Sequence, residues 1–436
     1  MRIAVDEGRT FYVFDVYKSG IILWRYLGIF QLEIMPQHCL PLGLFFFICW
    51  FVCEICPVDE VSYASKQNKV FSFWLNNCSE AEWFDDHPLP LPTWGISKPV
   101  FTIYSLEEYE ELVRKLENEL QILLKSKNID SVTNFIWFYN HYKSKMEDQS
   151  FDKFFREYEP MLNDNANNCV GLSLLLIGKL AKLDEFFPGI RECLYLVSCD
   201  RNCKNIEKYI SDIPNPLLTI IKHVLVSLKI EIFGRKGVLL LDPGYSIARV
   251  ITVMSDNLSP HTGYFPASTN AKKSYIFEMD SSERYIEWLT YSTDKIEDHA
   301  LIYIDAPYLS PISVTERRNL VDNYRALYSM NEKGQYLALF YVHVNNPVFH
   351  FIYQDYNHGN LEDWQHIKVP YEDFVSNKRI SNKFEVFLCH FSEQFKLTKE
   401  EFLTMLITLA NILNDEQFLN YRKSTDDRIF RIANWN

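Results

Sequence analysis

The chain has 436 residues, a formal charge of −13 at neutral pH, and many aromatic side chains, with 32 Phe and 26 Tyr. Its length allows two or three domains with large hydrophobic cores. The negative charge, with no local run of Lys and Arg to offset it, argues against nucleic-acid binding and against adhesion to anionic membrane surfaces.

Residues 1–56 form a hydrophobic N-terminal segment, in which no residue from Ile34 to Cys53 carries a formal charge. Its apolar core has about the length of a signal-peptide core and is short for a spanning helix. We expect residues 35–56 to be a signal peptide or membrane anchor, with membrane insertion only through residues 34–53, and hence a place in the secretory pathway or the membrane. The alternatives are a buried apolar segment in a cytoplasmic protein, or a translation start misassigned upstream of Met35.

Residues 57–162 are predicted to be mainly helical. Prolines at alternate positions predict an extended link near residues 87–100. Ser105 and Glu108 form a capping-box pair ahead of apolar residues at helical spacing, which predicts a long helix. A second helix, rich in aromatic residues, is predicted over Thr133–Lys145.

A cysteine stands where the next helix is predicted to begin. Polar residues 163–168 precede Cys169, and apolar residues then recur at helical intervals from Leu172 to Leu183. In the first turn, the helix dipole and unpaired N–H groups would favour the thiolate and could stabilise an oxyanion. The alternative is a small buried core cysteine, which is a common role for free cysteine.

Two strands are predicted to follow, joined by a turn over residues 234–237. The first strand begins at His223, which lies on the face opposite to that of Val224, and the second ends at Asp242. A hairpin would bring the two side chains together, although their register is open. Asp242 could then orient the His223 imidazole, and His223 could deprotonate or pair with Cys169. The alternatives are a strand-end histidine and an aspartate that serves a turn.

The order Cys169, His223, Asp242, with these local contexts, resembles the transglutaminase-like (papain-like) cysteine superfamily. Within it, the His223 strand, the basic turn and the ending Asp-Pro-Gly-Tyr are most similar to the arylamine N-acetyltransferase branch. The resemblance implies a catalytic triad of these three residues, a barrel and lid after the nucleophile helix, an acyl-CoA donor and an amine acceptor. Asn167-Asn168 replaces the Arg-Gly-Gly-Arg run usual before the acetyltransferase cysteine, and Val170 replaces the Trp usual after the transglutaminase cysteine, so the substrate is open.

The rest of the chain is predicted to be strand-rich and to end in a helix capped by Thr398 and Glu401. A hairpin is predicted where Tyr336–Val344 and Pro347–Gln354 flank two asparagines. The other predicted strands are Val250–Met254, Ser274–Met279, Ala300–Ile304 and Phe384–Phe391.

Histidines and cysteines in this half of the chain suggest no metal site. Strand alternation and loop positions account for His343, His350, His358 and His366. Cys199 and Cys203 lack a second ligand pair, so zinc is not expected. A Cys199–Cys203 disulfide, or one that involves Cys78, would be possible in a secreted protein.

The sequence thus predicts an α+β fold, with a helical N-terminal part, a nucleophile helix packed on an antiparallel sheet or barrel, and a C-terminal α/β region. The predicted regions are residues 1–56, 57–162, 163–270 (the thiol-triad core) and 271–436. The leading function is a cysteine-dependent acyltransferase for a small-molecule amine or peptide substrate, with acyl-CoA as co-substrate and no tightly bound cofactor. The alternatives are a transglutaminase- or amidase-like enzyme and a catalytically inactive binding protein on the same fold.

Overall fold

The computed structural model describes residues 2–6, 9–13, 82–84, 87–162, 167–201, 206–211, 214–267, 272–293, 295–346, 348–354, 364–375 and 382–433. The chain divides into two compact units, Met1–Ser62 and Tyr63–Asn436. In the first unit, β1 (Arg2–Asp6) and β2 (Arg9–Val13) form an antiparallel pair. The predicted signal or anchor segment lies outside the described residues. Among the helices that are described, none is both long and apolar enough to cross a membrane.

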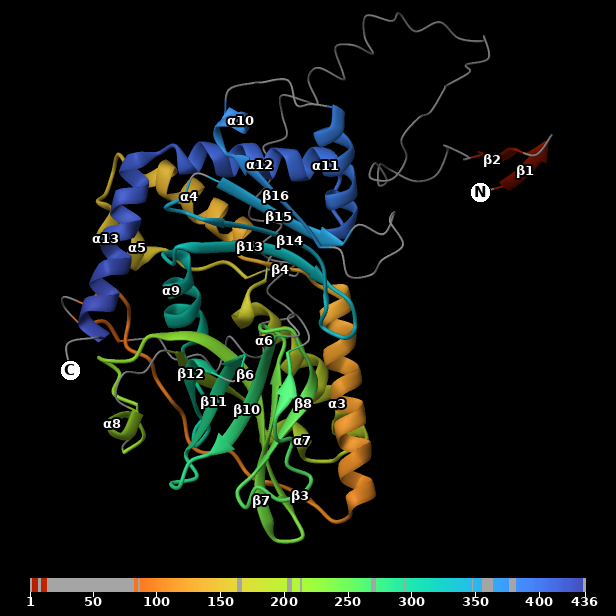
Figure 1. Ribbon diagram of the computed structural model, residues 1–436, viewed down its shortest axis with the longest axis vertical. Helices are drawn as coiled ribbons and strands as arrows, with labels where there is room; N and C mark the ends of the chain where they lie inside the picture. Colours follow the sequence, from red (N-terminus) through yellow and green to blue (C-terminus); the bar gives the residue numbers. More distant parts are fainter. Residues whose placement is uncertain are drawn as a thin grey trace, which may run out of the picture. The chain divides into compact units, whose positions relative to one another are not determined.

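The second unit is built around a large antiparallel sheet that curls, since its strands β8 and β10 also contact each other (Figure 1). β3 (Phe101–Ile103) adds to β6 in parallel. In spatial order the antiparallel strands are β8 (Ile247–Met254), β7 (Arg235–Asp242), β6 (Ile221–Ile232), β5 (Leu194–Arg201), β12 (Lys295–Tyr303), β11 (Tyr285–Ser292), β10 (Lys273–Met279) and β9 (Phe265–Pro266).

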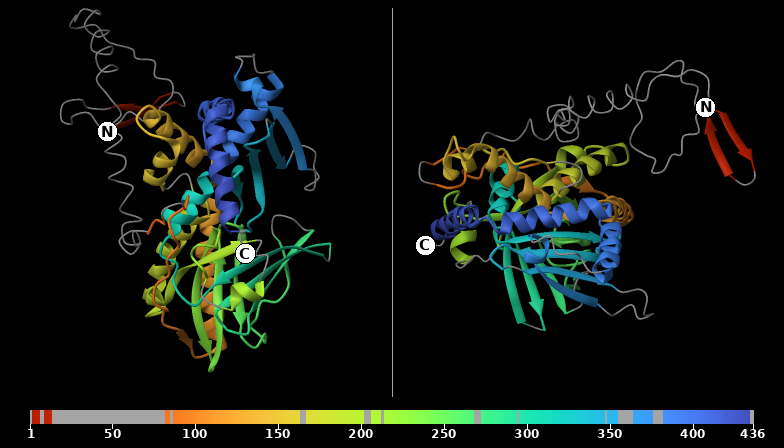
Figure 2. Two further views of the ribbon diagram at one scale, coloured as in Figure 1. Left: turned by 90° about the vertical axis from the view of Figure 1, so that its left-hand side faces the viewer. Right: turned by 90° about the horizontal axis from the view of Figure 1, so that it is seen from above.

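A second antiparallel sheet has the order β16 (Trp364–Pro370), β15 (Val348–Gln354), β14 (Tyr336–His343), β13 (Tyr324–Met330), β4 (Ile129–Asp130). The predicted hairpin is confirmed as β14–β15. Figure 2 shows α12 (Lys399–Leu413) running across this sheet, where Phe402 contacts the rings of Phe340 and Phe351. The other helices that add to this core are α4 (Val132–Lys145), α5 (Phe151–Glu157), α10 (Glu372–Val375), α11 (Asn382–Gln394) and α13 (Glu416–Ala433).

Two helices pack against the large sheet. α3 (Leu106–Ser126) contacts β8, and α6 (Cys169–Leu180) contacts β6. The helix predicted after Ser105 is confirmed, because the Ser105 side chain accepts a hydrogen bond from the Glu108 amide. The helix predicted near Thr133–Lys145 is confirmed as α4. Short elements complete the fold: η1 (Ala181–Glu185), α7 (Ile190–Cys193), α8 (Ile206–Ile210), η2 (Pro311–Glu316) and α9 (Arg317–Leu320).

Three sequence predictions were wrong. Phe384–Phe391 is part of helix α11, since Leu388, Phe391 and Phe395 repeat at helical spacing and are buried together. The helix capped by Thr398 is followed by one more, α13. The turn between β6 and β7 is Phe233–Gly234, where both residues have positive φ, as a two-residue type I′ turn requires.

Both faces of the central strand β6 are buried, because the sheet curls around a second core. Val224 and Val226 belong to the core shared with α3 and α6, whereas Leu225 belongs to the aromatic core inside the curl. Strand pairs also cross the predicted region boundaries: β5 pairs with β12, and β4 pairs with β13. The region boundaries at residues 162 and 270 stay predictions.

Candidate active site

Cys169 is the first residue of α6, as predicted. Asn168 is the N-cap, with extended backbone, and its side chain accepts a hydrogen bond from the Val170 amide at 2.9 Å. A Cβ at Gly171 would lie 2.1 Å from Oδ1 of Asn167, so only glycine fits this first turn beside the buried Asn167. The local sequence Asn-Asn-Cys-Val-Gly thus fixes where the helix starts and leaves Cys169 half-buried.

His223 and Asp242 form a buried pair inside the curl of the large sheet. The register pairs Val226 with Leu241, so His223 and Asp242 stand diagonally on the same face. His223 Nε2 lies 2.9 Å from Oδ2 of Asp242, and the two residues are 3% and 0% exposed. The Tyr245 amide donates to the other carboxylate oxygen at 3.0 Å. The diagonal geometry gives the predicted contact with a two-residue turn and no register shift between β6 and β7; the register shift at Asp242 lies in the pairing of β7 with β8.

Gly244 brings Cys169 and His223 together. A Cβ at this position would lie 2.7 Å from Cβ of Cys169 and 2.8 Å from Cε1 of His223. Those two carbons are therefore no further apart than the sum of the two distances, about 5.5 Å. The glycine in Asp-Pro-Gly-Tyr serves close approach, and any side chain here would separate the thiol from the imidazole.

Aromatic side chains enclose the His223 ring from inside the sheet. Tyr245 meets it edge-on at 4.7 Å between ring centroids, and Trp288 packs on Tyr245 at 4.8 Å. The Tyr328 hydroxyl donates to the Gly244 carbonyl at 3.4 Å. This wall keeps water from the His223–Asp242 hydrogen bond and restrains the imidazole orientation.

The thiol of Cys169 is strongly held in its neutral form. Burial raises its pKa to about 12, and the carboxylates of Glu316 and Asp242 act in the same direction. The backbone N–H groups of Val170 and Val224 lower the pKa, but burial outweighs them. The expectation that the helix start would favour a resting thiolate is thus wrong for this environment.

Two polar residues next to Cys169 were not predicted. Asn319, in α9, has its amide nitrogen 3.9 Å from the Cys169 sulfur and 3.3 Å from the Lys222 carbonyl oxygen. Glu316, which ends η2, is buried, accepts a hydrogen bond from Asn134 at 3.0 Å, and has its pKa raised by burial to about 7. Both lie on an irregular π-turn and a four-residue helix, which have no periodic pattern that a sequence could reveal.

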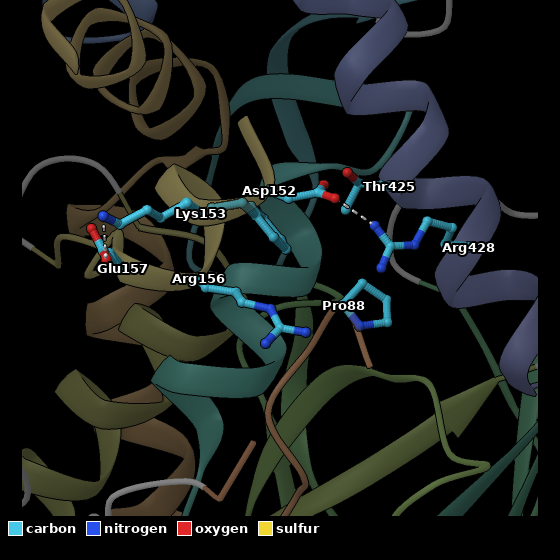
Figure 3. A pocket seen from close by; sticks show the side chains of 8 residues that line it. Pro88, Asp152, Lys153, Arg156, Glu157, Thr425 and Arg428 are labelled. Carbon is cyan, nitrogen blue, oxygen red and sulfur yellow. Dashed lines mark hydrogen bonds and ion pairs between the residues drawn. The ribbon is translucent and has the colours of Figure 1, made fainter. Parts of the chain in front are cut away.

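Two surface cavities lie away from Cys169. One, of about 200 Å³, is lined by β8 and β9 and the other, of about 390 Å³, by α5 and α13 (Figure 3). In the larger cavity Arg428 pairs with Asp152, and Lys153 pairs with Glu157. The charges of this lining are thus mixed in sign.

Other histidines and cysteines bear on the predictions about metal sites and disulfides. His350 and His366 share a hydrogen bond of 2.9 Å between ring nitrogens, while His358 lies outside the described residues. Within the described ranges, no three His, Cys, Asp or Glu side chains gather as metal ligands. Cys78 and Cys203 are not among the described residues, so the disulfides that involve them stay predictions.

Comparison with known proteins gives a partial similarity of structure. No protein-family model matches the chain, and no curated protein matches it either. An arylamine N-acetyltransferase from Mycobacterium smegmatis is similar with a TM-score of 0.39 and 10% identity over 73% of this chain and 94% of that one. The enzyme from M. tuberculosis has a TM-score of 0.36 and 12% identity, with 67% and 93% covered.

A third similar structure is the M. marinum arylamine N-acetyltransferase in complex with CoA, with a TM-score of 0.38 and 9% identity over 69% of this chain and 93% of that one. These values describe a distant likeness in overall arrangement. The chemistry proposed below rests on the side chains of this chain.

Proposed function

We propose that the chain is a cysteine-dependent acyltransferase in which Cys169 is the nucleophile, His223 the general base and acid, and Asp242 the residue that orients His223. The observation that carries the proposal is the close approach of Cys169 to a buried His223–Asp242 pair beside Gly244, with Cβ of Cys169 and Cε1 of His223 at most about 5.5 Å apart. A nucleophile, a base beside it and a carboxylate that orients the base are the three parts of a covalent acyl-transfer site.

The hydrogen bonding supports a defined role for each nitrogen of the imidazole. Nε2 of His223 pairs with the Asp242 carboxylate, which favours a proton on Nε2 and leaves Nδ1 to accept one. Asp242 would then stabilise the imidazolium that forms when Nδ1 takes the thiol proton. The enclosed ring cannot rotate without displacing Tyr245.

The raised pKa of Cys169 supports a particular timing of proton transfer. A thiol whose pKa is about 12 is neutral at pH 7, so the resting enzyme would hold Cys169 as the thiol. His223 would remove the proton as the sulfur attacks the acyl carbon. The acyl group would then pass from the sulfur to an amine, again with His223 as base.

The proposed donor is an acyl-CoA and the proposed acceptor an amine, in line with the sequence resemblance to the acetyltransferase branch. The same site chemistry would accept a glutamine or peptide amide, so both donor classes belong in the test. The experiment incubates the purified chain with acetyl-CoA or with a glutamine peptide, adds a panel of amines, and measures free CoA thiol or released ammonia. Acyl transfer that is lost in Cys169→Ala supports the proposal, and equal background rates in both proteins would refute it.

A non-catalytic binding protein is the second candidate, because the thiol is neutral and its carboxylate neighbours disfavour ionisation. Such a protein would show no acylation of Cys169 by any activated donor.

A further inference from the structure

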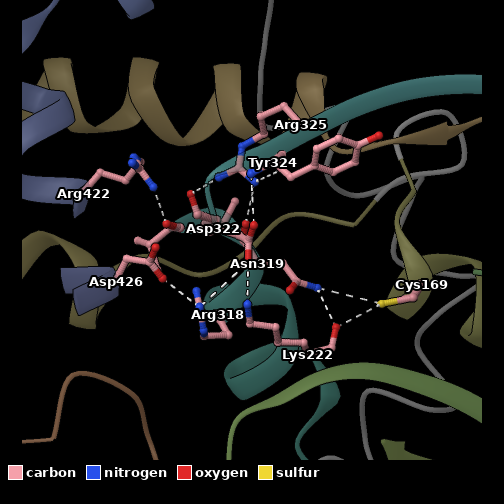
Figure 4. A network of polar contacts seen from close by, with 11 residues as sticks. Cys169, Lys222, Arg318, Asn319, Asp322, Tyr324, Arg325, Arg422 and Asp426 are labelled. Atoms are coloured by element: carbon pink, nitrogen blue, oxygen red, sulfur yellow. Dashed lines mark hydrogen bonds and ion pairs between the residues drawn. The ribbon is translucent and has the colours of Figure 1, made fainter. Parts of the chain in front are cut away.

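We propose that Asn319 is a further catalytic residue of this site, whose side-chain amide donates a hydrogen bond to the oxyanion formed when Cys169 attacks a carbonyl group. The inference rests on the proposed acyl-transfer function and adds a residue from a different segment of the chain. Figure 4 shows the Asn319 side chain directed at the sulfur from α9, whereas Cys169 itself belongs to α6.

The position of the amide fits that role. Its nitrogen lies 3.9 Å from the sulfur and carries two hydrogens, of which one is directed to the Lys222 carbonyl oxygen at 3.3 Å. The other hydrogen faces the thiol. In a tetrahedral adduct the oxygen is one atom removed from the sulfur, which brings it toward donors placed around the thiol, within reach of the 2.7–3.1 Å that an oxyanion donor needs.

Asn319 is also held rigidly, which an oxyanion donor requires. Arg325 donates to the backbone carbonyl oxygen of Asn319 at 2.8 Å, and its other terminal nitrogen donates to the Leu320 carbonyl oxygen. The Arg325 side chain is buried and packs over the Phe135 ring at 4.4 Å. A four-residue helix has little stability of its own, so this guanidinium fixes the end of α9 and with it the amide.

The polar network around α9 reaches the C-terminal helix (Figure 4). Arg318 pairs with Asp426 of α13 at 2.7 Å, and Asp322 pairs with Lys222 at 2.9 Å. Lys222 supplies the carbonyl oxygen that accepts the hydrogen bond of the Asn319 amide. The buried Arg325 thus anchors one partner of that hydrogen bond, and the half-buried Lys222–Asp322 ion pair anchors the other. The network thus joins α13 to the surroundings of the thiol.

The proposed step moves one proton and forms one carbon–sulfur bond. Nδ1 of His223 takes the thiol proton, and the sulfur forms a bond to the carbonyl carbon of the donor. The carbonyl π electrons move to the oxygen, where the Asn319 amide stabilises the negative charge. Collapse of this adduct restores the carbonyl and expels the donor's leaving group, which takes the proton from His223 if its basicity requires one, so that an acyl thioester remains on Cys169.

The test compares two reactions of the same sulfur. Acylation by p-nitrophenyl acetate passes through an oxyanion, whereas alkylation by iodoacetamide displaces iodide at a saturated carbon and forms none. Rates of both are measured at one pH for the parent, Asn319→Ala, and the control Asn411→Ala, which alters an exposed residue of α12. We expect Asn319→Ala to slow acylation about 10²- to 10³-fold and alkylation only a few-fold.

Equal losses of both rates, or no loss, would overturn the inference while leaving the proposed function intact. A parent in which p-nitrophenyl acetate does not acylate Cys169 would overturn the proposed function, and the inference with it. If Asn319→Ala does not fold, Asn319→Ser keeps a polar group at this half-buried position, with a hydroxyl too short to reach the adduct. The same ratio of rates then decides the question.

Discussion

Two buried polar clusters meet beside Cys169, and they are built in opposite ways. The His223–Asp242 pair has one hydrogen bond between its side chains and an apolar, aromatic surround. The cluster around α9 holds three fully buried arginines, Arg318, Arg325 and Arg422. Their partners include two aspartates and several backbone carbonyl oxygens. The first cluster is arranged to move a proton, and the second to keep a short helix in place.

The two clusters have separate roles in this fold, one in the chemistry and the other in the stability of α9. An imidazole that is oriented by a single carboxylate can take up and release a proton with little rearrangement. Guanidinium groups stay charged at neutral pH, even for Arg325, whose pKa burial lowers to about 9, and they hold carbonyl groups in a fixed geometry. Substitutions in the first cluster should therefore reduce activity with little loss of stability, and substitutions in the second should do the reverse.

The greatest loss of activity is expected from a change in the His223–Asp242 pair. Asp242→Asn keeps the shape of the side chain but favours the wrong imidazole tautomer, so we expect acyl transfer to fall about 10³- to 10⁴-fold. Rates of transfer from acetyl-CoA, measured with urea denaturation on the same samples, check this. A variant that kept most of its activity would break the division, since Asp242 would then have only a structural role.

The next largest effect is a loss of stability from a change in the arginine cluster around α9. Asp426→Ala leaves the fully buried Arg318 without its closest carboxylate, and we expect a loss of about 3–5 kcal/mol in the free energy of unfolding. The matched control is Asp427→Ala, one residue along the same helix at an exposed position, which should change stability by less than about 0.5 kcal/mol. Equal losses in the two variants, measured by urea denaturation, would contradict the assignment.

The close approach of Cys169 to His223 can be tested at Gly244, which lies against both side chains. Gly244→Ala places a methyl group against both side chains, so we expect acyl transfer to be lost and stability to fall by about 1–3 kcal/mol. Gly178→Ala is the control. Gly178 lies on the same helix as Cys169, and a methyl group there would have no other atom within 4 Å apart from the helix's own backbone. That control should stabilise the protein by about 0.5–1 kcal/mol. An active Gly244→Ala enzyme would show that the two groups need not touch.

The smallest effect concerns the charge of Glu316. When its carboxylate ionises, it opposes ionisation of Cys169, so Glu316→Gln should lower the pKa of the thiol. We expect about three- to tenfold faster alkylation by iodoacetamide at a fixed alkaline pH. Unchanged alkylation would show that Glu316 is too distant or too well screened to matter.

Glu316 also affects the pH dependence of stability. Its pKa is raised in the folded chain to about 7, so the folded state keeps a proton that the unfolded state has already lost. Stability should therefore fall as pH rises between about 4.5 and 7. The pKa of the buried Asp200 is raised in the same way, so Glu316→Gln should flatten this decline only in part. Thermal denaturation across that range measures the slope.

The regular elements were the predictable part of this structure. Apolar periodicity and caps identified α3, α4 and α6, and strand alternation identified both members of the β14–β15 hairpin. The turn between the two strands was predicted two residues too late. Phe233 occupies the first turn position with a positive φ, which is uncommon for a phenylalanine. Helix α11 was mistaken for a strand, because the run Phe384–Phe391 is short and the helical spacing of Leu388, Phe391 and Phe395 extends beyond it.

The site was predictable only where its residues end regular elements. Cys169 begins α6, Asp242 ends β7, and His223 is the third residue of β6, so the sequence could propose them together. Asn319 and Glu316 approach from a distant irregular segment through tertiary packing, and nothing local distinguishes them. The raised pKa of Cys169 depends on burial by that same packing, which explains why a resting thiolate was wrongly expected.

We propose that His223 takes the proton of the Cys169 thiol as the sulfur attacks an acyl donor. Trapping of the acyl-enzyme is the first experiment to perform. The parent, Cys169→Ala and His223→Ala are mixed with acetyl-CoA or p-nitrophenyl acetate without an amine, quenched in acid, and analysed by peptide mass spectrometry. The account predicts an acetyl group on Cys169 in the parent, none at this position in Cys169→Ala, and a far slower rise in His223→Ala. Equal rates of acetylation in the parent and His223→Ala, or acetyl groups only on other residues, would contradict it.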